Sequence, residues 1–332
     1  MKKLFLFSVA ALAFCACSND ETVSENNAAS QQPKEISFSP LTKPNTRAEV
    51  EGTTFPTGQD MYVAAYDATA NQDYFAQTTF DEDGTTGLWK ANPKKYWPMN
   101  AATLNFLAYT GVPSGSYFDE THPAQDLTIS LADNSSNQYD LMYACGRQSR
   151  ALNTAASNVD MNFKHALALI KFEVKTASDY SYGDPKVYPL AITSIVLTGA
   201  HYSGTYTINN SANYNSTTSD FAGLTGNWSS VNTQANVTRT PTFANITTEF
   251  KQVGAGILVV PDDNDETDDY TKFTINYTLD GKPYSYDYTP ADLDVHQAKK
   301  YTFQITMTLN EIIIAPTVTD YVEENNNAVT IN

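Results

Sequence analysis

The sequence predicts an all-β protein with two tandem antiparallel β-sandwich domains, and three observations support this prediction. The chain has 332 residues, which at about 150 residues per domain corresponds to two domains. Its aromatic residues are mainly 21 Tyr and 16 Phe, which favour pleated, half-buried surfaces. After a polar N-terminal stretch, nearly every apolar segment alternates with polar residues at a period of two, as strands with one buried face do.

The composition also argues against several classes of protein. Hydrophobic residues make up 41% of the chain, which is enough for folded cores, so the chain is not disordered as a whole. The 37 acidic residues outnumber the 20 basic ones, and the net charge of −17 opposes nucleic-acid binding through phosphates. With only three cysteines, no disulfide scaffold is expected. We expect no cofactor.

The first residues have the pattern of an export signal. Lys2 and Lys3 precede an apolar run of 13 residues, Leu4 to Ala16, which is too short to span a membrane. A small residue directly before Cys17 resembles the lipobox of bacterial lipoproteins. We therefore expect residues 1–16 to be a lipoprotein signal peptide and Cys17 to carry acyl chains that anchor the protein in the outer membrane. The alternative is an ordinary signal peptide with two chance cysteines.

Two short segments separate this signal from the main body of the chain. Residues 17–34 are predicted to be the lipidated cysteine and a flexible tether, because Val23 is their only large apolar residue. Residues 35–47 begin with a short alternating strand, Glu35-Ile36-Ser37-Phe38-Ser39, and end in a polar loop that contains Arg47.

Residues 48–180 are predicted to form the N-terminal sandwich. Its candidate strands are Met61–Tyr66, Tyr74–Phe80, Leu104–Tyr109, Leu127–Leu131 and Leu141–Ala144. A longer apolar run, Met161–Val174, changes phase between Leu169 and Ile170. A β-bulge or a bend between two sheets would explain this change, and a buried helix is the alternative, since Ala-Leu-Ala-Leu favours helix.

Residues 181–332 are predicted to form the C-terminal sandwich, after a boundary within Lys175–Pro189. Two alternating runs flank Asp280-Gly281, which is a type I′ hairpin signal, and Tyr301–Leu309 is another one-sided strand. The stretch Thr205–Thr248 is rich in Asn, Ser and Thr, so it is predicted to be a long surface excursion.

No catalytic motif is found, and we expect no enzyme. The four histidines do not have the spacing of a zinc site. His165 lies in the long apolar run and is expected to be a core histidine with its hydrogen bonds satisfied. Cys145, between Ala144 and Gly146, is expected to be a small packed residue.

One acidic stretch is a weak candidate for a calcium site. Residues 262–269 are dense in carboxylates, and Asp263, Asp265 and Asp268 offer the oxygen ligands that Ca²⁺ prefers. The stretch lacks the Gly and the distal Glu of an EF-hand loop. A solvated loop without metal is therefore the alternative.

Three segments resemble the fimbrillin family, the subunits of type V pili. They are Leu88-Trp89 with Tyr96-Trp97-Pro98 and Leu104-Asn105-Phe106-Leu107-Ala108-Tyr109; Tyr139-Asp140-Leu141-Met142-Tyr143-Ala144; and Phe163-Lys164-His165-Ala166-Leu167-Ala168 with Ile170-Lys171-Phe172-Glu173-Val174. The resemblance, with the lipoprotein start, covers residues 1 to about 175. It implies transthyretin-like sandwich domains, cleavage by an arginine-specific protease after the first strand, and subunits joined by strand exchange.

In this chain the matching bond for cleavage is Arg47–Ala48, in the polar loop Lys43–Glu49, and the alternative is an ordinary surface arginine. The donor candidates are the apolar residues of the C-terminal stretch: Ile312, Ile313, Ile314, Val318, Val329 and Ile331. The alternative is that Ile312 to Val318 is simply the last strand of its own domain.

The resemblance implies a structural or adhesive subunit of a cell-surface pilus. Its expected partners are other pilus subunits, of the same or a related kind, the outer membrane through the lipid on Cys17, and a ligand on a host or bacterial surface. Nucleic acid is not an expected partner. The alternative is an outer-membrane surface lipoprotein that does not polymerise and binds glycans through exposed aromatic residues.

Overall fold

The structure is a computed structural model in which residues 33–40, 60–118, 126–150, 158–177, 189–209, 226–261, 272–290, 295–308, 311–321 and 329–330 are described. The chain divides into two compact units, Met1–Gln32 and Pro33–Asn332, and all the described residues lie in the second. Every regular element among them is a strand, so the all-β prediction is confirmed. None of the described segments forms a helix that could cross a membrane.

The first sheet has eight strands in the order β8-β1-β4-β3-β2-β5-β7-β9. Their bounds are β1 Ser37–Pro40, β2 Met61–Asp67, β3 Gln72–Asp83, β4 Leu88–Ala91, β5 Ala102–Thr110, β7 Met142–Arg150, β8 Val159–Met161 and β9 Lys164–His165. Neighbours are antiparallel except β1 and β8, which run parallel.

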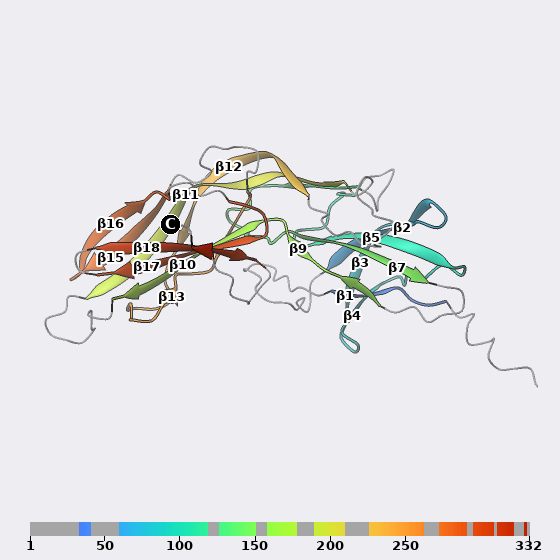
Figure 1. The fold of residues 1–332 in the computed structure, drawn as a ribbon, viewed down its shortest axis with the longest axis horizontal. Helices are drawn as coiled ribbons and strands as arrows, with labels where there is room; N and C mark the ends of the chain where they lie inside the picture. The colour runs from blue at the N-terminus through green and yellow to red at the C-terminus, as the bar shows by residue number, and fades with distance from the viewer. Residues whose placement is uncertain are drawn as a thin grey trace, which may run out of the picture. The chain divides into compact units, whose positions relative to one another are not determined.

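The other strands form two further sheets (Figure 1). The second sheet has the order β13-β10-β17-β18-β19, with β14 also on β10: β10 Ala168–Thr176, β13 Lys251–Gln252, β14 Ile257–Val259, β17 Lys299–Met307, β18 Ile312–Asp320 and β19 Val329–Thr330. The third has the order β12-β11-β15-β16, with β6 also on β11: β6 Asp126–Leu131, β11 Leu190–Asn209, β12 Asn227–Arg239, β15 Lys272–Leu279 and β16 Lys282–Tyr288.

The second and third sheets pack face to face around one hydrophobic core. Phe172 and Phe303 of the second sheet meet Phe273 of the third, with ring centroids 4.9 Å apart in both pairs. Apolar side chains from two sheets that meet in this way define a β-sandwich, as the sequence predicts. The closer resemblance to transthyretin and the division into two domains near residue 180 stay predictions.

The eight-stranded sheet curls around a core of its own. Phe38 on β1 and Phe106 on β5 lie with ring centroids 5.1 Å apart, although three strands separate β1 from β5 in the sheet. In a flat sheet these two strands would be about 19 Å apart, at the usual spacing between neighbours. The sheet must therefore fold over, and the space that it encloses is filled by apolar side chains, among them Ile36, Phe80 and Met161.

Within the long apolar run the chain bends between two sheets, just before the position of the phase change. The chain leaves the first sheet at β9, bends at Ala166 and Leu167, and enters the second sheet as β10. The bend is one of the two explanations that the alternation allowed, and the helical alternative is wrong. Because β10 then pairs in parallel with β17, about 130 residues further on, this run connects the two halves of the sequence.

Residues 205–248 differ from their prediction. The described part is largely strand, since β11 continues to Asn209 and pairs with β12 from Asn227 to Arg239, with two register shifts. Most side chains of β12 are exposed, but Trp228 is buried and its indole N–H donates to the carbonyl oxygen of Ala166 at 2.7 Å. Sheet pairing satisfies the backbone whatever the side chains are, so a polar sequence can form a long strand here.

Candidate functional site

The segment around β1 is the best candidate for a functional site, because a short strand near the N-terminus is embedded in the core. Ile36 and Phe38 have no exposed surface. The ring of Phe38 stands edge-on to Phe80, with centroids 4.8 Å apart, and to Phe106. Each fully buried side chain of this size contributes about 1.5–3 kcal/mol relative to its exposed state.

The backbone of this segment is bonded on both sides. On one side, Phe38 pairs with Trp89 of β4 in antiparallel orientation, and the N–H of Ile36 donates to the carbonyl oxygen of Lys95 at 2.8 Å. On the other side, β1 runs parallel to β8, with Phe38 opposite Val159. The strand therefore fills a slot between two neighbours, and its loss would leave both of them with an unpaired edge.

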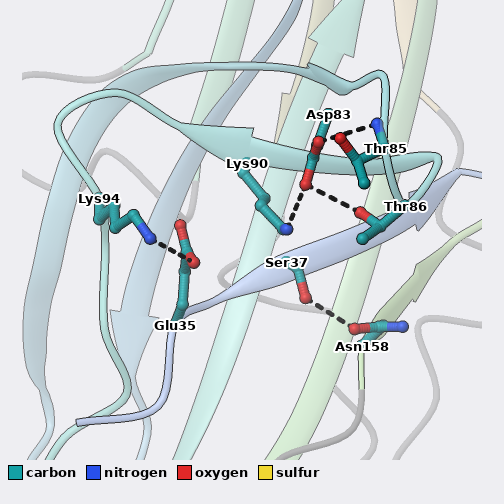
Figure 2. A network of polar contacts seen from close by, with 8 residues as sticks. All are labelled: Glu35, Ser37, Asp83, Thr85, Thr86, Lys90, Lys94 and Asn158. Atoms are coloured by element: carbon teal, nitrogen blue, oxygen red, sulfur yellow. Dashed lines mark hydrogen bonds and ion pairs between the residues drawn. The ribbon is translucent and has the colours of Figure 1, made fainter.

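Polar contacts frame the strand at its exposed margin (Figure 2). The Lys94 ammonium lies 3.2 Å from a carboxylate oxygen of Glu35, which raises the pKa of Lys94. The hydroxyl of Ser37 donates to Oδ1 of Asn158 at 2.7 Å. Both contacts are solvent-exposed, so they align the strand and add little to its stability.

A separate carboxylate holds the hairpin that forms one wall of the slot (Figure 2). Asp83, at the end of β3, accepts hydrogen bonds from the Lys90 ammonium, from the N–H of Thr85 at 3.0 Å and from the hydroxyl of Thr86 at 3.0 Å. The ammonium is the main cause that lowers the pKa of Asp83. These contacts stay within the β3–β4 hairpin and involve no residue of β1.

Several predicted site residues lie outside the described residues. They are the lipidation candidate Cys17, the predicted cleavage pair Arg47 and Ala48, the donor candidate Ile331, and the calcium candidates Asp263, Asp265 and Asp268. Among the residues that the structure describes, no group of three His, Cys, Asp or Glu side chains could hold a metal ion.

The other donor candidates belong to the second sheet. Ile312, Ile314 and Val318 of β18 are partly buried against the sandwich core, whereas Ile313 on the outer face is 50% exposed. The strand pairs with β17 along its whole length, from Met307 opposite Ile312 to Lys299 opposite Asp320. Val329 lies on β19, opposite Val318.

His165 is a buried, hydrogen-bonded core residue, which confirms its prediction. It belongs to a cluster of buried side chains that the sequence did not reveal. Asp140 and His165 are both buried, and Nδ1 of His165 lies 3.0 Å from Oδ1 of Asp140. The hydroxyl of Tyr321, at the end of β18, donates to the other oxygen of Asp140 at 3.0 Å. The rings of His165 and Tyr321 stack with centroids 3.6 Å apart.

Two of these three residues carried a signal in the sequence. Asp140 and His165 stand in two of the segments that resemble fimbrillins, which suggested core positions but not that these positions meet. Tyr321 carried no signal, since a lone tyrosine after a strand is common.

Cys145 is partly buried against a cluster of buried apolar side chains. Burial raises the pKa of its thiol, in keeping with the packed residue that the sequence predicts.

Exposed aromatic side chains form a second, smaller feature. Tyr284 and Tyr286 on the edge strand β16 are 45% and 38% exposed. The ring of Tyr284 stacks on that of Tyr277 of β15, with centroids 5.6 Å apart. This pair of exposed tyrosines fits the glycan-binding alternative.

The chain is similar to known proteins in both sequence and structure. The sequence model of the fimbrillin-like family matches residues 46–320. A candidate cell adhesion protein from Bacteroides uniformis has a similar structure, with a TM-score of 0.53 at 15% identity over 88% of this chain and 100% of that one. Another from Bacteroides ovatus has a TM-score of 0.51 at 12% identity over 89% and 100% of the two chains. A fimbrial protein from Bacteroides vulgatus reaches 0.45 at 14% identity over 87% and 100%. A search of curated proteins found no match.

The fold and the site define an all-β protein with a β-sandwich and a short N-terminal strand in a core slot. The two structures with TM-scores above 0.5 are similar to it in overall fold. Since the family model covers well over half of its length, the chain belongs to the fimbrillin-like family.

Proposed function

We propose that this chain is a pilus subunit that is exported as a lipoprotein on Cys17, cleaved between Arg47 and Ala48, and assembled by strand exchange at the cell surface. Membership of the fimbrillin-like family supports a pilus or adhesion subunit. The observation that carries the finer proposal is β1, because a segment so close to the N-terminus fills a slot in the apolar core.

Cleavage after Arg47 would change how β1 is held without changing its contacts. While the chain is intact, β1 is tethered to its slot and its effective concentration there is high, on the order of millimolar for a short flexible link. After cleavage the strand is a separate peptide that can dissociate and be diluted. The family match begins at residue 46, so β1 lies outside the matched region and the Arg47–Ala48 bond lies at its start.

The empty slot would accept a strand of similar pattern. It would present pockets for two apolar side chains in alternation, those of Ile36 and Phe38, and free backbone groups on β4 and β8. An exposed edge beside an apolar groove favours strand addition, with backbone hydrogen bonds for affinity and pockets for specificity. The donors would come from the C-terminal residues of another subunit, with Ile312, Ile313, Ile314, Val318, Val329 and Ile331 as candidates.

The acyl chains on Cys17 would hold the precursor in the outer membrane until cleavage. Removal of residues 1–47 separates the anchor from the body together with β1, so one cut would both release the subunit and open its slot. The partners are then other pilus subunits, of the same or a related kind, and a ligand on a host or bacterial surface.

An Arg47→Ala variant tests the cleavage step. Polymer of the unaltered protein should begin at Ala48 by N-terminal sequencing, whereas the variant should remain a monomer that begins at Cys17. Lys43→Ala, in the same loop, is the matched control and should polymerise normally because the protease requires arginine. Normal polymer from the Arg47 variant would contradict the proposal.

A second function, glycan binding, is favoured by the exposed row on β16. Tyr284 and Tyr286 are 45% and 38% exposed, and aromatic side chains offer a sugar ring rigid apolar area with a polar tip. Replacement of both tyrosines by alanine should abolish binding to a glycan array while polymers still form. Unchanged glycan binding in this double variant would exclude β16 as the site.

A further inference from the structure

We infer that the segment between β4 and β5, residues 92–100, rests on the anionic headgroups of the membrane while the chain is anchored there. This segment is called the basic loop below. Three features meet in it: a positive charge within an acidic protein, exposed apolar side chains, and a position where the N-terminal segment enters the body. The inference rests on the lipid anchor proposed at Cys17 and adds a surface of the body that contacts the bilayer.

The basic loop and the chain beside it carry a charge opposite to that of the whole protein. Residues 33–36 and 92–100 contain three lysines, Lys34, Lys94 and Lys95, and one acid, Glu35, so their net charge is +2, whereas the chain carries −17. Lys94 pairs with Glu35, yet its side chain is 60% exposed (Figure 2). At an ionic strength of about 0.1 M, exposed charges more than about 10 Å apart are largely screened from each other. The charges nearest to an anionic surface therefore decide whether it attracts this face.

Two exposed apolar side chains belong to the same loop. Met99 is 56% exposed, the most exposed of the large apolar side chains in the described part of the chain, and Tyr96 is 41% exposed. A tyrosine ring with its polar tip suits the boundary between headgroups and acyl chains. Lysines can extend their aliphatic stems along such a boundary and keep their charge in water. The composition of the loop therefore fits a bilayer surface.

The neighbours of these two side chains hold the loop in place. Trp97, which lies between them in the sequence, is 2% exposed. The hydroxyl of Tyr74 donates to the carbonyl oxygen of Tyr96 at 2.6 Å, and Nη1 of Arg150 donates to the carbonyl oxygen of Pro98 at 3.1 Å. The backbone is thus bonded on both sides of the buried tryptophan, so the loop needs little further ordering when it meets a surface.

The basic loop lies where the N-terminal segment joins the body. The N–H of Trp97 donates to the carbonyl oxygen of Lys34, and the N–H of Ile36 donates to the carbonyl oxygen of Lys95, both at 2.8 Å. Sixteen residues separate Cys17 from Lys34, and a flexible tether of that length reaches about 20–24 Å on average. An anchor at Cys17 would therefore keep this loop, more than the distant parts of the body, close to the bilayer.

A weak contact is sufficient at this position. A short flexible tether gives the loop an effective concentration at the membrane on the order of millimolar, so even a contact of millimolar affinity is often formed. Each lysine near an anionic surface strengthens binding by about fivefold. Cleavage at Arg47 would remove the tether together with Lys34, so the body would leave the surface although the loop itself is unchanged.

Vesicle binding tests the loop without the lipid anchor. The mature chain without its lipidated cysteine, residues 18–332, is sedimented at millimolar lipid with vesicles of equal parts phosphatidylcholine and phosphatidylglycerol, and with vesicles of phosphatidylcholine alone. Binding to the anionic vesicles should be at least about fivefold stronger than binding to the neutral ones.

Two double variants and one control assign that binding to the loop. Tyr96→Ser with Met99→Ser, and Lys94→Gln with Lys95→Gln, should each weaken binding to the anionic vesicles by at least about fivefold. Tyr284→Ser with Tyr286→Ser is the matched control, because it removes two exposed tyrosines from β16, and it should bind as the unaltered chain does. Urea unfolding shows whether each variant is folded, and the lysine variant decides the test if the apolar variant is not.

Three results would overturn the inference: no binding to anionic vesicles, unchanged binding by the loop variants, or an equal loss in the β16 control. If the loop variants bind vesicles normally but no longer polymerise in cells, the loop is a contact between subunits, which also overturns a membrane contact. The anchor is tested separately by fractionation of the Cys17→Ala precursor, so failure of the proposed anchor and failure of the loop contact are distinguishable.

Discussion

Replacement of Phe38 by alanine measures how strongly β1 is held by its pocket. The side chain has no exposed surface, and its ring contacts Phe80 and Phe106 edge-on, at centroid distances of 4.8 and 5.1 Å. Removal of a buried phenylalanine ring costs about 3–5 kcal/mol, because its transfer energy is lost and a cavity remains. The free energy of unfolding should fall by this amount, a large fraction of the about 5–15 kcal/mol that stabilises a typical protein.

The measurement is urea unfolding of the intact chain, with Ser37→Ala as the matched control. The control removes an exposed hydrogen bond to Asn158, so it should cost no more than about 0.5 kcal/mol. In the cleaved protein the Phe38 variant should bind its strand roughly 100- to 4000-fold more weakly, which is the same free energy expressed as affinity. A loss of stability below about 1 kcal/mol would refute the reasoning, because it would be close to the about 0.5 kcal/mol of an ordinary surface substitution.

Three further predictions concern the lipid anchor, a loop and the dependence of stability on pH in acid. Cys17→Ala should leave the precursor outside the outer-membrane fraction, and unchanged membrane partitioning would contradict lipidation at this residue. Gly111→Ala should lower the free energy of unfolding by at least about 2 kcal/mol, because φ is +82° and an added Cβ would lie 1.8 Å from the carbonyl oxygen of Asp140; an unchanged melting curve would show that the loop relaxes. Asp83→Asn should be destabilising at pH 7. Lys90 lowers the folded pKa of Asp83 below its ordinary value of 3.8, so the contribution is present above that pH and is lost as the pH falls through the folded pKa. The difference between variant and parent in urea unfolding should therefore shrink in acid, and a difference that does not change with pH would assign the effect to another cause.

Features that depend on neighbouring residues were predictable. The β15–β16 hairpin is an example, because Asp280 and Gly281 adopt φ of 52° and 74°, the left-handed values that a type I′ turn requires. The bend at Ala166–Leu167 is another, since it lies just before the change of phase in the apolar alternation, between Leu169 and Ile170. Strand β12 was missed because its exposed side chains are polar, and only its pairing with β11 identifies it as a strand.

The candidate site also has features that were predictable from the sequence and features that were not. That Ile36 and Phe38 share a buried face could be inferred from their spacing of two residues. That Phe38 meets Phe106 depends on the curl of an eight-stranded sheet, and that Tyr321 meets Asp140 depends on contacts across 181 residues.

The sequence alone determined that the protein is all-β, where most strands lie and which family its segments resemble. Alternation and turn residues act within a few positions, so they can be read along the chain. The tertiary structure decided which strands are neighbours, that β1 fills a slot between β4 and β8, and that the end of β18 is tied to a buried carboxylate. These features are set by packing between residues that are distant in sequence, because many strands share the same pattern and only the assembled cores select one pairing among them.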